Sequence, residues 1–151
     1  MKHRKLVLLC LFVPHLANFS FGNSLPCLTT PAPDESCLQI HNWSDFETAI
    51  KYHPSNINTT TPLIFCPFFI QKSTTSALRI KKRIQIICLK PGQCSIDTSA
   101  SGGVSILKLD IFRKNGSILI QGIKFLNSAS AIHVLSKVSS EAVFCDCEFH
   151  R

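Results

Sequence analysis

Short apolar runs separated by turn residues occupy the chain from Pro62 onward. The runs are "PLIFCPFFI", "ALRIKKRIQIICLK", "CSID", "VSILKLDIF", "SILIQGIKF", "AIHVLS" and "AVFCDCEF". They are rich in Ile, Val, Leu and Phe, and Gly, Ser, Asn and Pro lie between them, which is typical of strands bounded by turns. No helical pattern interrupts the series. The pattern therefore predicts an all-β region built from short strands.

One run, "SILIQGIKF", raises the question of how successive strands are connected. Alternation places Ile118 and Ile120 on one face, and the Gln121-Gly122 step then resets the phase so that Ile123 and Phe125 also point inward. A two-residue loop containing Gly would also suit a hairpin, although Gln-Gly is not a strong hairpin dipeptide. We favour a corner between two walls of a coil, because a similar string returns downstream.

The returning string begins 24 residues later, so that residues 117–125 align with residues 141–149 and their apolar positions match. The runs "SILKLD" and "AIHVLS" precede the two blocks as partner strands. Upstream, Cys66 and Cys88 suggest a similar spacing of 22 residues in "IFC" and "IIC". A unit of this length cannot bury its apolar face alone, but stacked copies form a continuous core. The repeat predicts a solenoid of a few coils.

A short amphipathic helix, "SDFETAIKYH", is expected ahead of the strands. Ser44 and Glu47 have the spacing of a capping box, and Pro54 ends the helix. Phe46 and Ile50 lie on one apolar face, which predicts packing against the β region.

The first residues have the pattern of a secretory signal peptide. A basic start is followed by an apolar run, residues 6–13, that is too short to span a bilayer. We expect cleavage after residue 22, with cleavage near residue 17 or a retained anchor as alternatives. The predicted organisation is a signal peptide over 1–22, an irregular Cys- and Pro-containing arm over 23–43 and a β domain over 44–151. The mature protein is expected to be secreted, without a transmembrane span.

The strings "RIQIICLKPGQCSID", "NGSILIQGIKFLNSASAIHV" and "AVFCDCEF", preceded by the helix "FETAI", resemble right-handed parallel β-helix proteins of the pectin-lyase-like fold. The resemblance covers residues 44–151 and implies a right-handed solenoid with a helix capping its N-terminal end. Asn127 resembles the asparagines that fill turns in such coils. Because "CDCEFHR" stops where a strand ends, we expect a truncated or short member of this class.

Enzymatic chemistry finds little support in the residues. Proteins with this fold include polysaccharide lyases and hydrolases as well as non-enzymatic surface proteins, so the fold does not decide function. Arg79-Ile80-Lys81 matches a polygalacturonase-like motif, but Gly-His-Gly and adjacent aspartates are missing. His133 has no carboxylate placed beside it by the sequence, and Ser128 and Ser130 read as turn residues. We predict no catalytic residues and no cofactor.

Seven cysteines remain after the signal peptide, which takes Cys10 with it. They are Cys27, Cys37, Cys66, Cys88, Cys94, Cys145 and Cys147. In a secreted chain they predict disulfides, with Cys27–Cys37 and Cys88–Cys94 as candidate pairs and at least one thiol left over. Cys145 and Cys147 would share a strand face as packed or oxidised side chains, because a lone C-x-C is too little for zinc. No metal site is predicted.

A basic cluster and three sequons complete the candidate sites. Removing Lys2, Arg4 and Lys5 lowers the net charge from +7 to +4, and much of this excess lies in Arg79–Arg83. The candidate polyanion patch consists of Arg79, Lys81, Lys82 and Arg83; a solvated strand edge is the alternative. The candidate N-glycosylation sites are Asn42, Asn58 and Asn115.

These observations predict a secreted, non-enzymatic β-helix protein that binds acidic polysaccharide or cell-wall glycan, or serves as a structural component. Nucleic acid is not an expected partner, because the chain has one Trp, one Tyr and no recognisable binding module. Two alternatives remain open: a fragment of a polysaccharide lyase or hydrolase, and a small disulfide-stapled effector whose strands form a sandwich. A sandwich would be expected to join cysteines distant in sequence.

Overall fold

The computed structural model describes residues 27–28, 36–54, 61–103, 105–111, 117–128, 130–136 and 141–151. The predicted signal peptide and two of the sequons, Asn58 and Asn115, lie outside these residues. The described residues form α1 (Trp43–Tyr52), β1 (Leu63–Phe65), β2 (Phe68–Gln71), β3 (Leu78–Ile80), β4 (Ile84–Cys88), β5 (Cys94–Asp97), the 3-10 turn η1 (Ser99–Ser101), β6 (Leu107–Ile111), β7 (Ser117–Gln121), β8 (Ile123–Leu126), β9 (Ile132–Ser136), β10 (Glu141–Cys145) and β11 (Glu148–Phe149).

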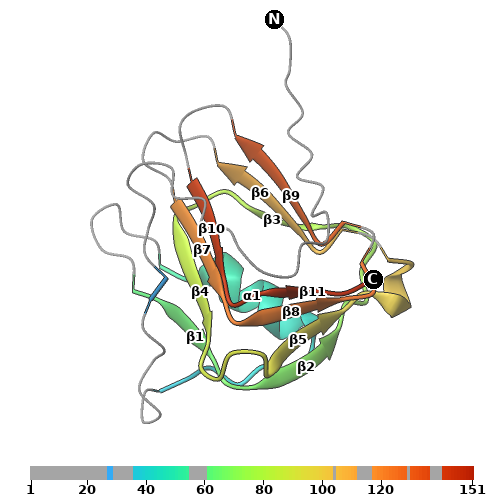
Figure 1. Ribbon diagram of the computed structural model, residues 1–151, viewed down its shortest axis with the longest axis horizontal. Coiled ribbons are helices and arrows are strands. Elements are labelled where there is room, and N and C mark those ends of the chain that lie inside the picture. Colours follow the sequence, from blue (N-terminus) through green and yellow to red (C-terminus); the bar gives the residue numbers. More distant parts are fainter. Residues whose placement is uncertain are drawn as a thin grey trace, which may run out of the picture.

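The strands form three parallel sheets that the chain visits in turn (Figure 1). Sheet A has the order β1-β4-β7-β10, sheet B the order β2-β5-β8-β11 and sheet C the order β3-β6-β9. Each complete coil contributes one strand to every sheet, and all pairs are parallel. This cycling confirms the predicted solenoid and rules out the sandwich alternative, whose strands would pair mainly antiparallel.

The "QG" step is the corner between sheets A and B. β7 ends at Gln121 and β8 begins at Ile123, and Gly122 between them has φ +75°, which glycine adopts without strain. Ile120 and Ile123, on either side of the corner, are both buried in the core. A Cβ at Gly122 would lie 3.0 Å from Pro91 Cα, so the corners of adjacent coils also pack too closely for a side chain.

The downstream repeat appears directly in the strand register. Ser117 pairs with Glu141 and Phe125 with Phe149, which is the predicted offset of 24. The upstream offset of 22 was wrong by one residue, because Cys88 pairs with Phe65 and not with Cys66. A shift of one residue exchanges the two faces of a strand.

Helix α1 closes the end of the first coil, as the resemblance implied. The ring centroid of Phe46 lies 5.3 Å from that of Phe65 and 5.9 Å from that of Phe68, and Trp43 packs on the same group. These aromatic side chains join the helix to the interior residues of sheets A and B. Burial of large rings is a major source of stability in a small core.

The predicted capping box does not start this helix. Asn42 is the N-cap residue, and its Oδ1 accepts a hydrogen bond of 3.0 Å from the Asp45 backbone N–H. Ser44 lies inside the helix, because Asn caps at least as well as Ser and precedes it by two residues. The helix ends before Pro54 as predicted, with His53 in an extended conformation that the following proline favours.

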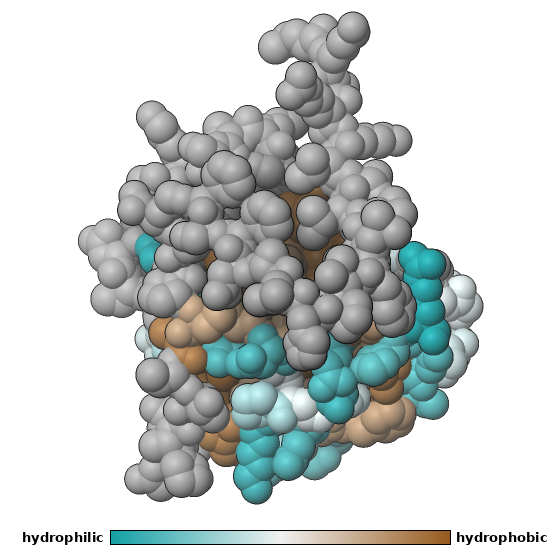
Figure 2. Space-filling view, viewed as in Figure 1, coloured by the Kyte–Doolittle hydropathy of each residue, from teal (hydrophilic) through white to brown (hydrophobic). Residues whose placement is uncertain are grey.

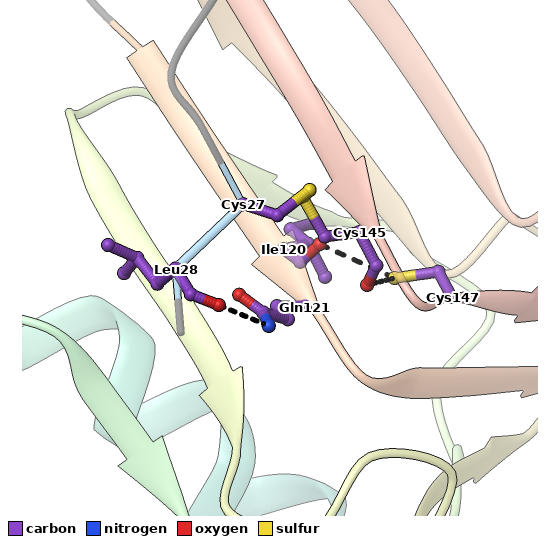
Figure 3. The surroundings of a disulfide bond; sticks show 6 residues. All are labelled: Cys27, Leu28, Ile120, Gln121, Cys145 and Cys147. Atoms are coloured by element: carbon purple, nitrogen blue, oxygen red, sulfur yellow. Dashed lines mark hydrogen bonds between the residues drawn. A yellow bond between two sulfur atoms is a disulfide. The ribbon is translucent and has the colours of Figure 1, made fainter. Parts of the chain in front are cut away.

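Three disulfides join the described residues. Cys88–Cys94 is the predicted pair, whereas Cys27 bonds to Cys145 and Cys37 bonds to Cys66. The predicted Cys27–Cys37 pair was therefore wrong. The physical reason is that the described parts of the arm lie against sheet A: Leu38 forms a parallel bridge with Phe65 of β1, and Cys27 lies beside β7 and β10 (Figure 3). A disulfide between distant cysteines thus occurs in a solenoid, so the proposed criterion for a sandwich was also wrong.

Cys145 and Cys147 do not share a face. Asp146 has φ +51° and occupies the same corner position as Gly122 one coil earlier, so it resets the phase between the two cysteines. Cys145 turns outward to the arm, while Cys147 packs against the interior core and keeps a free thiol (Figure 3). Burial raises the pKa of the Cys147 thiol, which favours its protonated form.

The last coil leaves apolar surface in reach of solvent. Phe149 is stacked on Phe125 with centroids 5.2 Å apart, yet it remains 42% exposed. Ala142, Phe144 and Cys147 are only partly buried. Figure 2 shows hydrophobic surface between hydrophilic residues on the face seen in Figure 1.

Candidate functional site: a basic ladder and groove beside sheet C

The outer face of sheet C carries a row of basic side chains, here called the basic ladder and consisting of Arg79, Lys108 and His133. Arg79 pairs with Lys108 across β3 and β6, and Lys108 pairs with His133 across β6 and β9. Leu78 and Ile80, on either side of Arg79, are buried. Alternation along the strand therefore turns Arg79 to the outside.

The ladder places its basic groups at the spacing of neighbouring strands, about 4.8 Å between main chains. Like charges directly opposite each other in a sheet destabilise it. Arg79 and Lys108 lie directly opposite each other in this way. An anionic ligand on this face would offset the repulsion, because its charges would lie among the cations.

A groove adjoins the ladder at the edge of sheet C, between α1 and the segment that contains β3. Its volume is about 410 Å³, within the range of ligand pockets. The groove is lined by Glu47, Ile50, Lys51, Ala77, Leu78, Arg79, Ile80, Lys81 and Lys82. Four of these residues are basic and one is acidic, so the groove is cationic. Arg79 belongs to both the ladder and the groove.

The predicted basic patch divides into two parts in the structure. Arg79 and Lys81 are exposed. Lys82 instead donates hydrogen bonds to the carbonyl oxygens of Lys51, at 3.0 Å, and His53, at 2.6 Å. It therefore neutralises the C-terminal end of α1, where backbone carbonyls lack helical partners. Desolvation by burial lowers the pKa of Lys82. Arg83 is half-buried, and its Nε is buried without a hydrogen-bond partner.

A buried lysine, Lys72, supports the helix behind the groove. Its side chain is 0% exposed, donates to the carbonyl oxygen of Thr74, and places its ammonium 5.5 Å from the centre of the Trp43 ring. Burial lowers the pKa of Lys72, whereas the charge of Glu47 raises it. The ammonium of Lys72 thus balances part of the negative charge of Glu47. The basic residues that line the groove therefore dominate its charge.

Sequence reasoning found the β3 part of this site and missed the rest. Lys108 was not singled out, and His133 was considered only as a general base. The structure places His133 on an exposed face beside Lys108. The signal that could have found the ladder was the alignment of "LRI", "LKL" and "IHV", each with a basic residue between two apolar ones. It was missed because the coils containing them differ in length.

Two asparagines named in the sequence analysis, Asn127 and Asn42, make hydrogen bonds that stabilise local structure. Asn127 has φ +55° and its Nδ2 donates a 2.9 Å hydrogen bond to Asp97, so it fills a turn as the resemblance implied. Hydrogen bonds from Asn127 and Ser99 hold the pKa of the Asp97 carboxyl below its ordinary value. Asn42 is exposed, and its side chain caps α1.

Within the residues that the structure describes, no group of three or more His, Cys, Asp and Glu side chains is arranged to hold a metal ion. No helix among them has the length and apolar character needed to cross a membrane.

Comparison with known proteins gave no match: no family model, no curated protein and no solved structure is significantly similar to this chain. The class that the structure itself defines is a disulfide-linked parallel β-solenoid with a capping helix.

Proposed function

We propose that the protein is a secreted, non-enzymatic, right-handed parallel β-helix, similar to the pectin-lyase-like fold, that binds acidic polysaccharide along its basic ladder. The observation that carries this proposal is the in-register row Arg79–Lys108–His133 on an outward face. A linear polymer with a charge on each unit suits the adjacent cations Arg79 and Lys108, because more than one charge can be paired at once, and the row continues at His133.

The disulfides support an extracellular location. Three disulfides persist in an oxidising environment such as that outside the cell, and they are rare where thiols are kept reduced. A basic, exposed face in such a compartment would meet acidic glycans.

The test compares the protein with the double variant Arg79→Ser/Lys108→Ser on immobilised polygalacturonate and on heparin. Loss of two charge contacts, one from the exposed Arg79 and one from the half-buried Lys108, should weaken binding by about 5- to 30-fold at low salt. Elution should shift to lower salt, because exposed charges are screened within about 10 Å at 0.1 M.

Lys90→Ser is the matched control. Lys90 is exposed in the turn between sheets A and B, so its removal changes the net charge without touching sheet C. Equal weakening by Lys90→Ser, or unchanged retention of the double variant, would contradict the proposal. Circular dichroism should show that all variants remain folded, since the substituted side chains are outside the core.

A further inference from the structure

We infer that the groove between α1 and β3 receives the end of the acidic chain, so that each protein molecule binds at a chain terminus and its ladder contacts the units next to that terminus. This inference rests on the proposed function and names the part of the ligand that the groove would hold.

The position of β3 is the first step of the argument. Among the strands that the structure describes, β3 is an edge strand of sheet C, so the ladder runs from β9 through β6 and ends at Arg79 of β3. The groove begins at that same residue and has α1 on its other side. A chain that follows the ladder toward β3 therefore meets the helix that closes the first coil.

The attachment of α1 is the second step. Lys82 holds the carbonyl end of the helix through Lys51 and His53, and Phe46 fixes its other side to the aromatic core. The wall of the groove is thus tied to the solenoid at two places. A groove wall that is already held in place binds a ligand chain without the cost of ordering the wall, whereas a loosely attached segment would have to be ordered first.

The chemistry of the lining is the third step. Lys51, Arg79 and Lys81 can bind carboxylate or sulfate groups, as the ladder does. Glu47 differs, because a carboxylate repels an anionic chain but accepts hydrogen bonds from hydroxyl groups. A terminal sugar has a hydroxyl where an internal sugar has a glycosidic bond. A single carboxylate among cations therefore favours a chain end, whose free hydroxyl can donate a hydrogen bond, over a continuing chain, whose glycosidic oxygen cannot.

The first experiment measures how many protein molecules bind each chain of size-fractionated polygalacturonate, by isothermal titration calorimetry. Recognition of one terminus predicts one protein per chain at every length. A ratio that rises in proportion to chain length would overturn the inference while leaving the proposed function intact. Absence of salt-sensitive binding at all lengths would overturn both.

The second experiment uses short oligogalacturonides whose reducing or non-reducing end is chemically blocked. One of the two modifications should weaken binding by about tenfold, the equivalent of losing a buried hydrogen bond to a charged group. Equal affinity for free, reducing-end-blocked and non-reducing-end-blocked oligomers would overturn the inference.

Two variants connect this selectivity to the groove. Glu47→Gln should reduce the preference for free ends to within about twofold, because a neutral amide accepts a weaker hydrogen bond than a carboxylate. Lys108→Ser should weaken all oligomers together and keep the preference. If Glu47→Gln, folded by circular dichroism, keeps the full preference for free ends, the groove is not the site of recognition.

Discussion

The outer faces of sheets A and C differ although the same coils build both. On sheet A, the outward residues Ile87, Leu119 and Gln121 are all buried, and Gln121 Nε2 donates to the Leu28 carbonyl oxygen of the arm at 2.9 Å (Figure 3). On sheet C, the outward residues Arg79 and His133 are exposed.

The difference shows how a solenoid separates stability from recognition. The interior of every wall must be apolar, because stacked coils bury it. The outer faces carry no such requirement. In this protein the outer face of sheet A has buried side chains and is linked to the arm by a disulfide, while the outer face of sheet C keeps Arg79 and His133 in solvent and can be used for binding.

The largest decrease in stability is expected from removing the Cys27–Cys145 disulfide, which links the arm to sheet A. Cys27→Ala/Cys145→Ala opens a bond between residues 118 apart and should lower the free energy of unfolding by about 5 kcal/mol. Cys88→Ala/Cys94→Ala, whose residues are only 6 apart, should cost about 2 kcal/mol. Urea unfolding measures both. Similar losses for the two pairs would show that the arm does not contribute as a long-range link.

A smaller decrease in the free energy of unfolding is expected from a substitution at Gly122, the corner where sheet A ends. Gly122→Ala forces a side chain into φ +75° and against Pro91, and should destabilise the protein by about 2 to 4 kcal/mol. Gly102→Ala is the control, because Gly102 has the same φ but an added Cβ would meet no atom within 4 Å. It should cost about 1 to 2 kcal/mol. Equal melting temperatures for the two variants would argue against close corner packing.

Lowering the pH should destabilise the turn that contains Asp97 and leads from sheet B toward sheet C. The pKa of Asp97 is lowered in the folded state, so its contribution is present above the ordinary aspartate pKa and is lost as pH falls through the lowered folded value. Between neutral pH and about pH 3, the wild type should therefore lose more stability than Asp97→Asn. Parallel curves from denaturant unfolding would contradict this role for Asp97.

The smallest effect, and one of opposite sign, is expected on the ladder. Lys108→Glu places an acidic group between Arg79 and His133, and should raise the free energy of unfolding by about 0.5 kcal/mol while weakening polyanion binding. Lys108→Gln, which only removes the charge, should have about half that effect on stability. Destabilisation by both variants would mean that Lys108 serves the fold and not a ligand.

The sequence predicted the features that depend on local pattern. The phase reset at Gln121-Gly122 identified a corner, and the offset of 24 identified the register of β7 with β10. The corner can be predicted because alternation and a glycine suited to positive φ are properties of neighbouring residues. The register can be predicted because the same apolar pattern is repeated along the chain. The same logic, applied at Asp146, would have separated Cys145 from Cys147.

The site was less predictable, because it joins residues from strands and a helix that are distant in sequence. Arg79 and Lys81 stood out as part of a basic run. Nothing in that run distinguishes Lys82, which turns to the end of α1, from its neighbours. Lys108 and His133 join Arg79 only through the register of sheet C.

By itself, the sequence determined the all-β class, the stacking of coils and the capping helix, because short-range alternation and repetition encode them. Tertiary structure alone decided which cysteines pair, which outer face is covered and which basic residues lie side by side. The physical reason is that coils of unequal length bring together positions with no constant spacing along the chain. Cys27 of the arm bonds to Cys145 across such a stack. The basic residues of sheet C likewise come from three coils of the stack.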